Sequence, residues 1–138
     1  MITLSTAKKS ESLEEEWKLF SKGKYGPTAH WLEKHFRFKA VEDGELVGTI
    51  EGKIEGDVVY IAALMVKPTV RGKGVGQMLV NRAELFGKKH KATKTWLLTG
   101  ANWESNGFYQ KMGFTKSATI PKLFFNVDFN AYIRIIKQ

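Results

Sequence analysis

The sequence predicts a mixed α/β fold: one sheet of about six to seven strands, flanked on both faces by about four helices. Two observations carry this prediction. The alternating runs 36–41 and 46–54 are joined by an Asp-Gly turn, which is typical of a β-hairpin. Residues 58–66 are apolar throughout, and a glycine-rich turn and a helical pattern over 76–89 follow them. At 138 residues, the chain is expected to form a single domain over 1–138.

The N-terminal part predicts one strand and two helices. Residues 2–6 alternate between apolar and polar side chains, as a short first strand does. A Ser-x-x-Glu capping box and a later glycine predict a helix over 12–23. A second short helix is expected over 28–34. Apolar residues recur at helical spacing in the first helix and form its expected buried stripe: Leu13, Trp17 and Phe20.

The C-terminal part predicts the remaining strands. A strand over 95–99 follows the helix through a crossover, so it should run parallel to 58–66. A helix over 105–112 should end at Gly113, a residue that readily adopts the left-handed conformation found at helix ends. Two further strands are expected to complete the sheet, on either side of a Phe-rich loop: 114–119 and 130–137, with the loop over 120–129.

Composition excludes several classes of protein. The absence of cysteine excludes disulfides, thiolate metal sites and a cysteine nucleophile, and the three histidines lack metal-ligand spacing, so no metal is expected. No apolar run approaches the ~20 residues that span a bilayer, and no signal-peptide pattern is present, so a cytoplasmic protein without membrane contact is expected.

The net charge of +8 is unevenly distributed. Residues 1–60 contain 9 Lys and Arg against 11 Asp and Glu, whereas residues 61–138 contain 13 against 3. The basic half could attract a polyanionic ligand. Nucleic acid is a less favoured partner, because the lysines are scattered and no nucleic-acid-binding motif accompanies them.

The glycine-rich turn predicts a phosphate-binding site. Gly72, Gly74 and Gly76 lie between the apolar strand and the helix, and Arg71 and Lys73 add positive charge. A strand that ends in such a turn leaves backbone N–H groups unpaired at the positive end of the helix dipole. The spacing matches neither the dinucleotide fingerprint nor the P-loop. A turn without a ligand is the alternative.

Two motifs resemble those of the GCN5-related N-acetyltransferase (GNAT) superfamily. Arg71-x-x-Gly74-x-Gly76, preceded by a Val-x-Pro turn, looks like the family's acetyl-CoA-binding motif R/Q-x-x-G-x-G/A. Downstream, residues 102–114 resemble its second signature: an Asn, a small residue three positions later, then Phe-Tyr and Gly-Phe. One helix and one strand fit between them. The resemblance is sharp over 58–114 and loose elsewhere.

The resemblance implies acetyl-CoA as co-substrate. In GNAT proteins the central strand and its parallel neighbour splay apart, and the pantetheine arm lies between them. Tyr109 would stand near the sulfur and protonate the leaving thiolate. The residues expected to bind acetyl-CoA are Leu64, Met65 and Val66 on the strand, Arg71, Gly72, Lys73, Gly74, Val75, Gly76 and Gln77 at the turn, and Asn102, Phe108 and Tyr109 beyond it.

The acceptor is less defined by the sequence. The resemblance implies an N-acetyltransferase in which a primary amine attacks acetyl-CoA directly, with an acceptor site near Tyr25, His30 and Trp31 and the loop 120–129. Many GNAT enzymes carry a glutamate on the central strand, but 58–66 contains no carboxylate. The general base therefore stays open among Tyr60, Glu51, His30 and a water chain, and an acceptor with a low pKa is a further alternative. A non-catalytic acyl-CoA-binding sensor or scaffold is the alternative function, and a homodimer is possible.

Overall fold

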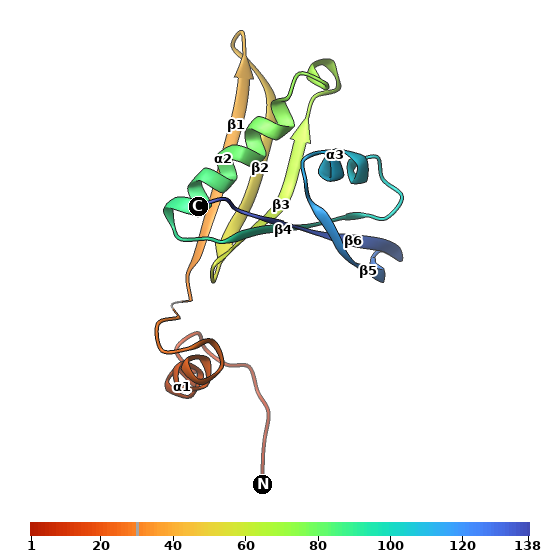
Figure 1. Ribbon diagram of the computed structural model, residues 1–138. Coiled ribbons are helices and arrows are strands. Elements are labelled where there is room, and N and C mark those ends of the chain that lie inside the picture. The colour runs from red at the N-terminus through yellow and green to blue at the C-terminus, as the bar shows by residue number, and fades with distance from the viewer. Residues whose placement is uncertain (30) are drawn as a thin grey trace. The chain divides into compact units, whose positions relative to one another are not determined.

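The computed structural model describes residues 1–29 and 31–138. The chain divides into two units, Met1–His30 and Trp31–Gln138. The first contains α1 (Glu14–Tyr25). The second contains all of the remaining elements (Figure 1): β1 (Glu33–Glu42), β2 (Glu45–Glu55), β3 (Val58–Val66), the 3-10 turn η1 (Pro68–Val70), α2 (Val75–Lys89), β4 (Lys94–Gly100), α3 (Ser105–Lys111), β5 (Thr115–Phe124) and β6 (Val127–Ile135).

The six strands of the second unit form one mixed sheet in the order β1-β2-β3-β4-β6-β5. All neighbours are antiparallel except β3 and β4, which are joined through α2 and run parallel. The predicted α/β class and the parallel crossover are therefore confirmed. The hairpin is confirmed as well: Asp43 and Gly44 have φ values of 52° and 78°, as a two-residue type I′ turn requires.

Both helices of the second unit pack on the same face of the sheet. Tyr132 and Arg134 are two residues apart on β6 and so point to the same face; Tyr132 packs against Tyr109 of α3, and Arg134 binds Glu84 of α2. The core lies under these helices, where Val59 of β3 is fully buried. The prediction of helices on both faces is therefore not met within residues 31–138.

The N-terminal predictions need correction. Residues 2–6 form no strand and are exposed. The helix begins at Glu14, with Leu13 at the N-cap position and no capping side chain, and it extends to Tyr25. No residue of α1 is buried. The predicted apolar stripe is exposed, and the exposed fraction of Trp17 is 49%. A helix buries its apolar stripe only against another element. Here the Trp17 and Phe20 rings stack on each other, with centroids 5.7 Å apart.

Two further boundaries differ from the predictions. The described residues of the expected helix over 28–34 are not helical: 28–29 and 31–32 are turn or coil, and Glu33 already pairs with Glu55 at the start of β1. The expected loop over 120–129 is mostly strand. Phe125 and Asn126 both have positive φ, 50° and 65°, and so close a two-residue turn between β5 and β6.

Among the described residues, no helix is long and apolar enough to cross a membrane.

Candidate active site

The parallel strands β3 and β4 separate halfway along their length. They pair only from Val58 with Lys94 to Ile61 with Leu97, although β3 continues to Val66 and β4 to Gly100. Figure 1 shows the two strands diverging beyond this point. The part of β3 after Ile61 keeps its β2 partners on one side and turns an unpaired backbone edge toward β4. We call this gap the notch. Its edge can form β-type hydrogen bonds with an extended amide-containing ligand.

A β-bulge lies at the base of the notch. Glu51 of β2 pairs with Ala63 and Gly52 pairs with Ile61, so Ala62 is the extra residue on β3. A bulge breaks the regular ladder and re-aims the residues that follow it. The three β3 residues predicted to bind the pantetheine arm through their backbone lie beyond the bulge, along the unpaired edge: Leu64, Met65 and Val66.

The predicted phosphate site follows directly from β3. Gly72 and Gly74 have φ values of 85° and 82°, which strain any other residue, and α2 begins at Val75. Within residues 31–138, the backbone N–H groups of Gly72 and of 74–77 donate to no protein acceptor. No atom lies within 4 Å of where a Cβ would stand on either glycine, so a ligand can approach the backbone closely. These groups fit the pyrophosphate of CoA.

The third glycine of the motif has a different role. A Cβ on Gly76 would stand 2.8 Å from the ring of Phe108, so only glycine allows α3 to pack this closely on the start of α2. The sequence predicts that Phe108 contacts acetyl-CoA. In the structure Phe108 lies between the phosphate site and Tyr109, and the ring centroids of Phe108 and Tyr109 are 5.1 Å apart.

Tyr109 is held rigidly on α3. It is 7% exposed, and its ring makes edge-to-face contacts with Phe108 and Phe114 at 5.1 and 5.6 Å. Burial raises the pKa of its phenol to about 12, so the hydroxyl stays protonated at neutral pH. Among the described residues, the hydroxyl forms no hydrogen bond with a protein group. It is thus a proton donor without a protein acceptor.

Comparison with known proteins agrees with this geometry. The sequence model of the acetyltransferase (GNAT) family matches residues 6–114. The chain belongs to the GNAT acetyltransferase family. A relative, the blasticidin-S acetyltransferase of Streptomyces morookaense, is 32% identical over 95 residues, which cover 65% of this chain and 66% of that protein. The matched region is therefore slightly under two thirds of the relative's length.

Solved acetyltransferases share the fold. Nourseothricin acetyltransferase superimposes with a TM-score of 0.71 at 24% identity, over 75% of this chain and 66% of that one. Aminoglycoside 6′-N-acetyltransferase, complexed with coenzyme A, gives a TM-score of 0.65 at 17% identity, over 76% and 74%. GNAT acetyltransferases use acetyl-CoA, and the notch and the phosphate site of this chain suit it.

The residues predicted for the acceptor site of this GNAT chain belong to different parts of the chain. Tyr25 ends α1 in the first unit, His30 lies outside the described residues, and Trp31 belongs to the second unit. Trp31 packs against Gly56 in the turn before β3, six residues from the bulge at Ala62. Their role in acceptor binding stays a prediction.

Sequence reasoning missed Asn106, which fixes α3 to the sheet. Its Nδ2 donates to the carbonyls of Gly100 and Trp103 at 2.9 and 2.7 Å. Its Oδ1 accepts from Asn130 Nδ2 and from the Tyr132 hydroxyl at 2.9 and 2.8 Å. The available signal was an Asn inside a short predicted helix, where Asn is otherwise unfavourable.

The predicted Asn102 is exposed and has no hydrogen bond to another described residue. Its side chain is therefore free to contact a ligand.

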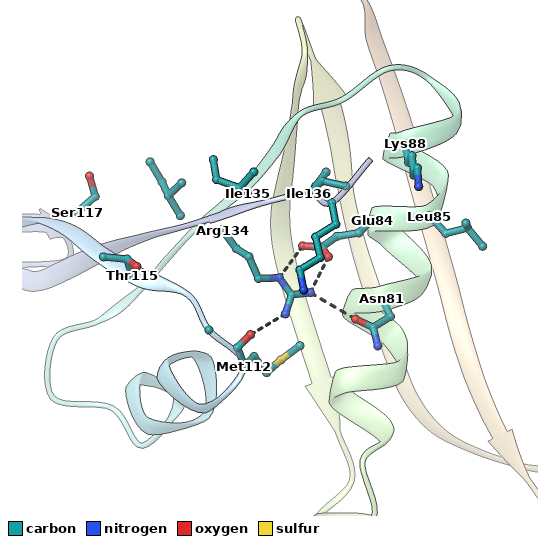
Figure 2. Close-up of a pocket in the computed structure, with 13 residues that line it drawn as sticks. Asn81, Glu84, Leu85, Lys88, Met112, Thr115, Ser117, Arg134, Ile135 and Ile136 are labelled. Carbon is teal, nitrogen blue, oxygen red and sulfur yellow. Dashed lines mark hydrogen bonds and ion pairs between the residues drawn. The ribbon is translucent and has the colours of Figure 1, made fainter.

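Two hollows lie on the second unit. The larger, about 940 Å³, lies beside α2, the end of α3 and the last strand, around the ion pair of Glu84 and Arg134 (Figure 2). The smaller, about 590 Å³, lies on β1, β2 and β3 next to the bulge, and includes Glu51, Tyr60 and Ala62 in its lining. Among the described residues, no group of three or more His, Asp or Glu side chains could hold a metal ion.

Proposed function

We propose that this chain transfers the acetyl group of acetyl-CoA to a primary amine by direct attack of the amine on the thioester. One observation carries the proposal: the notch between β3 and β4 leads into a turn whose N–H groups are unpaired at the start of α2. This is a continuous backbone path for a ligand with amides at one end and phosphates at the other. The relative in Streptomyces, which is named for acetylating blasticidin S, supports the same chemistry.

The backbone of β3 would bind and polarise the thioester. When bound, acetyl-CoA supplies an acetyl group activated by a thiolate leaving group. The unpaired edge from Ala62 to Val66 would hold the pantetheine amides, and an N–H near Leu64 or Met65 would donate to the thioester oxygen. One preorganised donor of this kind typically lowers the barrier by ~3 kcal/mol. The N–H groups of Gly72 and of 74–77 would hold the pyrophosphate.

Tyr109 would protonate the departing sulfur. The buried phenol of Tyr109 is protonated at neutral pH, so it carries a proton that a thiolate can take as the C–S bond breaks. A positioned acid typically contributes 10²- to 10⁴-fold to the rate. The attacking amine must also lose protons, since an alkyl amine with a pKa near ~10.4 arrives as an ammonium ion.

A non-catalytic acyl-CoA-binding module is the second candidate. The observation in its favour is that β3, Val58–Val66, carries no carboxylate next to the notch. Tyr109 supports the enzyme instead, because a protein that only binds CoA has no use for a proton donor at the sulfur.

One pair of measurements separates the two. Release of CoA is followed with a thiol reagent while acetyl-CoA is supplied with amines, polyamines and lysine peptides, and acetyl-CoA binding is measured by calorimetry. We expect micromolar-range binding and turnover with at least one amine. Binding without turnover across the panel would favour the sensor, and absence of binding would overturn both functions.

A further inference from the structure

The smaller hollow opens on the face of the sheet that α2 and α3 do not cover. Its β2 lining residue Glu51 alternates with Ile50 and Gly52, which are buried toward the helices, so Glu51 points to the opposite face. Tyr60 of β3 lies on that face too, since its partner is Lys53, two residues from Glu51. The hollow therefore reaches the base of the notch from the side away from the phosphate site.

Glu51 lies directly across from the bulge. Its β3 partner is Ala63, the residue that follows the extra residue Ala62. Side chains of directly opposed antiparallel residues have Cβ atoms roughly 4.5–5.5 Å apart. Ala62 and Ala63 are both exposed, and their small side chains place little bulk between Glu51 and the edge of β3 that lines the notch. Glu51 is therefore the carboxylate of β2 that lies opposite the bulge.

One oxygen of this carboxylate is fixed and the other is available. Nε of Arg37 on β1 donates to Oε2 of Glu51 at 2.9 Å. Among the described residues, no other hydrogen bond to the Glu51 carboxylate is formed. Arg37 therefore occupies Oε2, while Oε1 remains able to accept a proton.

An aromatic wall completes the hollow. The Tyr60 ring packs on Trp96 of β4 with centroids 4.7 Å apart, at the next-to-last paired position before the strands separate. An aromatic face beside a carboxylate is a favourable environment for an ammonium ion. The other charged or titratable groups that line the hollow are His35 and Arg37 on β1 and Lys53 on β2. Lys53 is already paired with Glu55 at 2.8 Å.

We propose that the hollow receives the acceptor as an alkyl ammonium ion and that Glu51 is its general base. The inference rests on the proposed acetyl transfer. Glu51 Oε1 takes one proton from the ammonium nitrogen, and the free amine then adds to the thioester carbon. As the C–N bond forms and the C–S bond breaks, the nitrogen loses a second proton to water. The thiolate gains a proton from Tyr109, and the Tyr109 phenolate and the Glu51 carboxylic acid then return to their starting forms by exchange with solvent. The products are the amide and CoA thiol, with one net proton released.

The chain offers a matched pair of variants for the test. Glu51→Gln keeps the shape of the side chain and an oxygen for Arg37 but cannot take up the proton. Glu55→Gln makes the same change on the same strand and face, at an ion-paired residue opposite Val58 and away from the notch. Each variant is assayed with an alkyl amine and with a weakly basic hydrazide that is unprotonated at neutral pH, and its acetyl-CoA affinity is measured by calorimetry.

We expect Glu51→Gln to lower kcat for the alkyl amine by about 10²- to 10⁴-fold. With the hydrazide the loss should shrink to less than about ten-fold, because no ammonium proton has to be removed. Acetyl-CoA affinity should not change, and Glu55→Gln should match the wild type. Equal activity of the two variants, or an equal loss with both acceptors, would overturn the role of Glu51. A wild-type protein that turns over no amine would overturn the proposed function and this inference with it.

A second variant tests the aromatic wall. Tyr60→Leu should raise the KM for the alkyl amine about two- to five-fold and leave the KM for the neutral hydrazide unchanged, since only a cation gains from the ring face. The same change in KM for both acceptors would contradict ammonium recognition by Tyr60.

Discussion

Arg134 of β6 forms hydrogen bonds with both carboxylate oxygens of Glu84 on α2: Nη2 donates to Oε1 at 2.6 Å, and Nε donates to Oε2 at 3.0 Å. The two side chains are only 17% and 13% exposed. Both side chains form further hydrogen bonds: the Thr95 hydroxyl donates to Glu84, and Arg134 donates to the carbonyl of Met112. As Figure 2 shows, this network ties α2 and the end of α3 to the last strand. It thereby holds α3 in place against α2, whose first turn carries the phosphate site.

Glu84→Ala should destabilise the protein by about 3–5 kcal/mol, because it leaves the Arg134 guanidinium buried without a counter-charge. Urea unfolding at neutral pH measures this loss. Glu45→Ala is the matched control: Glu45 binds Lys67 at a similar distance, 2.7 Å, but on the exposed surface. We expect the control to leave the unfolding midpoint nearly unchanged. Equal losses in the two variants would show that burial does not set the strength of the Glu84 pair.

Tyr109→Phe should lower kcat by about 10²- to 10⁴-fold while changing acetyl-CoA affinity by much less. The ring contacts with Phe108 and Phe114 survive this substitution, so the hydroxyl alone is tested. Steady-state kinetics with saturating acceptor and calorimetry with acetyl-CoA give the two quantities. If catalysis and affinity fell together, Tyr109 would be a binding residue rather than the acid.

The raised pKa of Tyr109 also predicts a pH-dependent stability. The folded phenol titrates at about 12 and an unfolded one near ~10, so between these values the folded state holds more protons. Stability should therefore be complete below pH ~10 and fall by about 2–3 kcal/mol as pH rises to ~12. Urea unfolding from pH 9 to 12 measures the loss. The free energy of unfolding of Tyr109→Phe should fall less steeply with pH than that of the wild type. Parallel pH dependences of the two proteins would argue against a raised pKa of Tyr109.

Gly74→Asp should abolish detectable acetyl-CoA binding, since it places a side chain and a negative charge where the phosphates are expected. Gly44→Asp controls for backbone strain: Gly44 has φ 78° against 82° for Gly74, and neither has an atom within 4 Å of a Cβ. Both variants should lose about 1–2 kcal/mol of stability from the left-handed conformation. Only Gly74→Asp should lose binding in calorimetry. Retained affinity would show that the phosphates bind elsewhere.

Local patterns in the sequence were enough to determine the framework of the site. The Asp43-Gly44 turn, the apolar run of β3 and the glycines before α2 each act within a few residues, and each appears in the structure where it was predicted. Their spacing, together with the Phe-Tyr pair of α3, was enough to indicate the GNAT family.

Only the tertiary structure decided which distant groups meet. Arg134 reaches Glu84 across 50 residues of sequence, and Asn106 reaches Tyr132 across 26. Glu51 became the favoured base once the register of β2 on β3 set it opposite Ala63, and a one-residue slip would have turned it to the other face. The stripe of α1 is a prediction that failed for the same reason: the periodicity of the sequence predicts an apolar helix face, but it does not predict which element covers that face. Register and contact depend on strand edges far apart in the chain, which no short window of sequence contains.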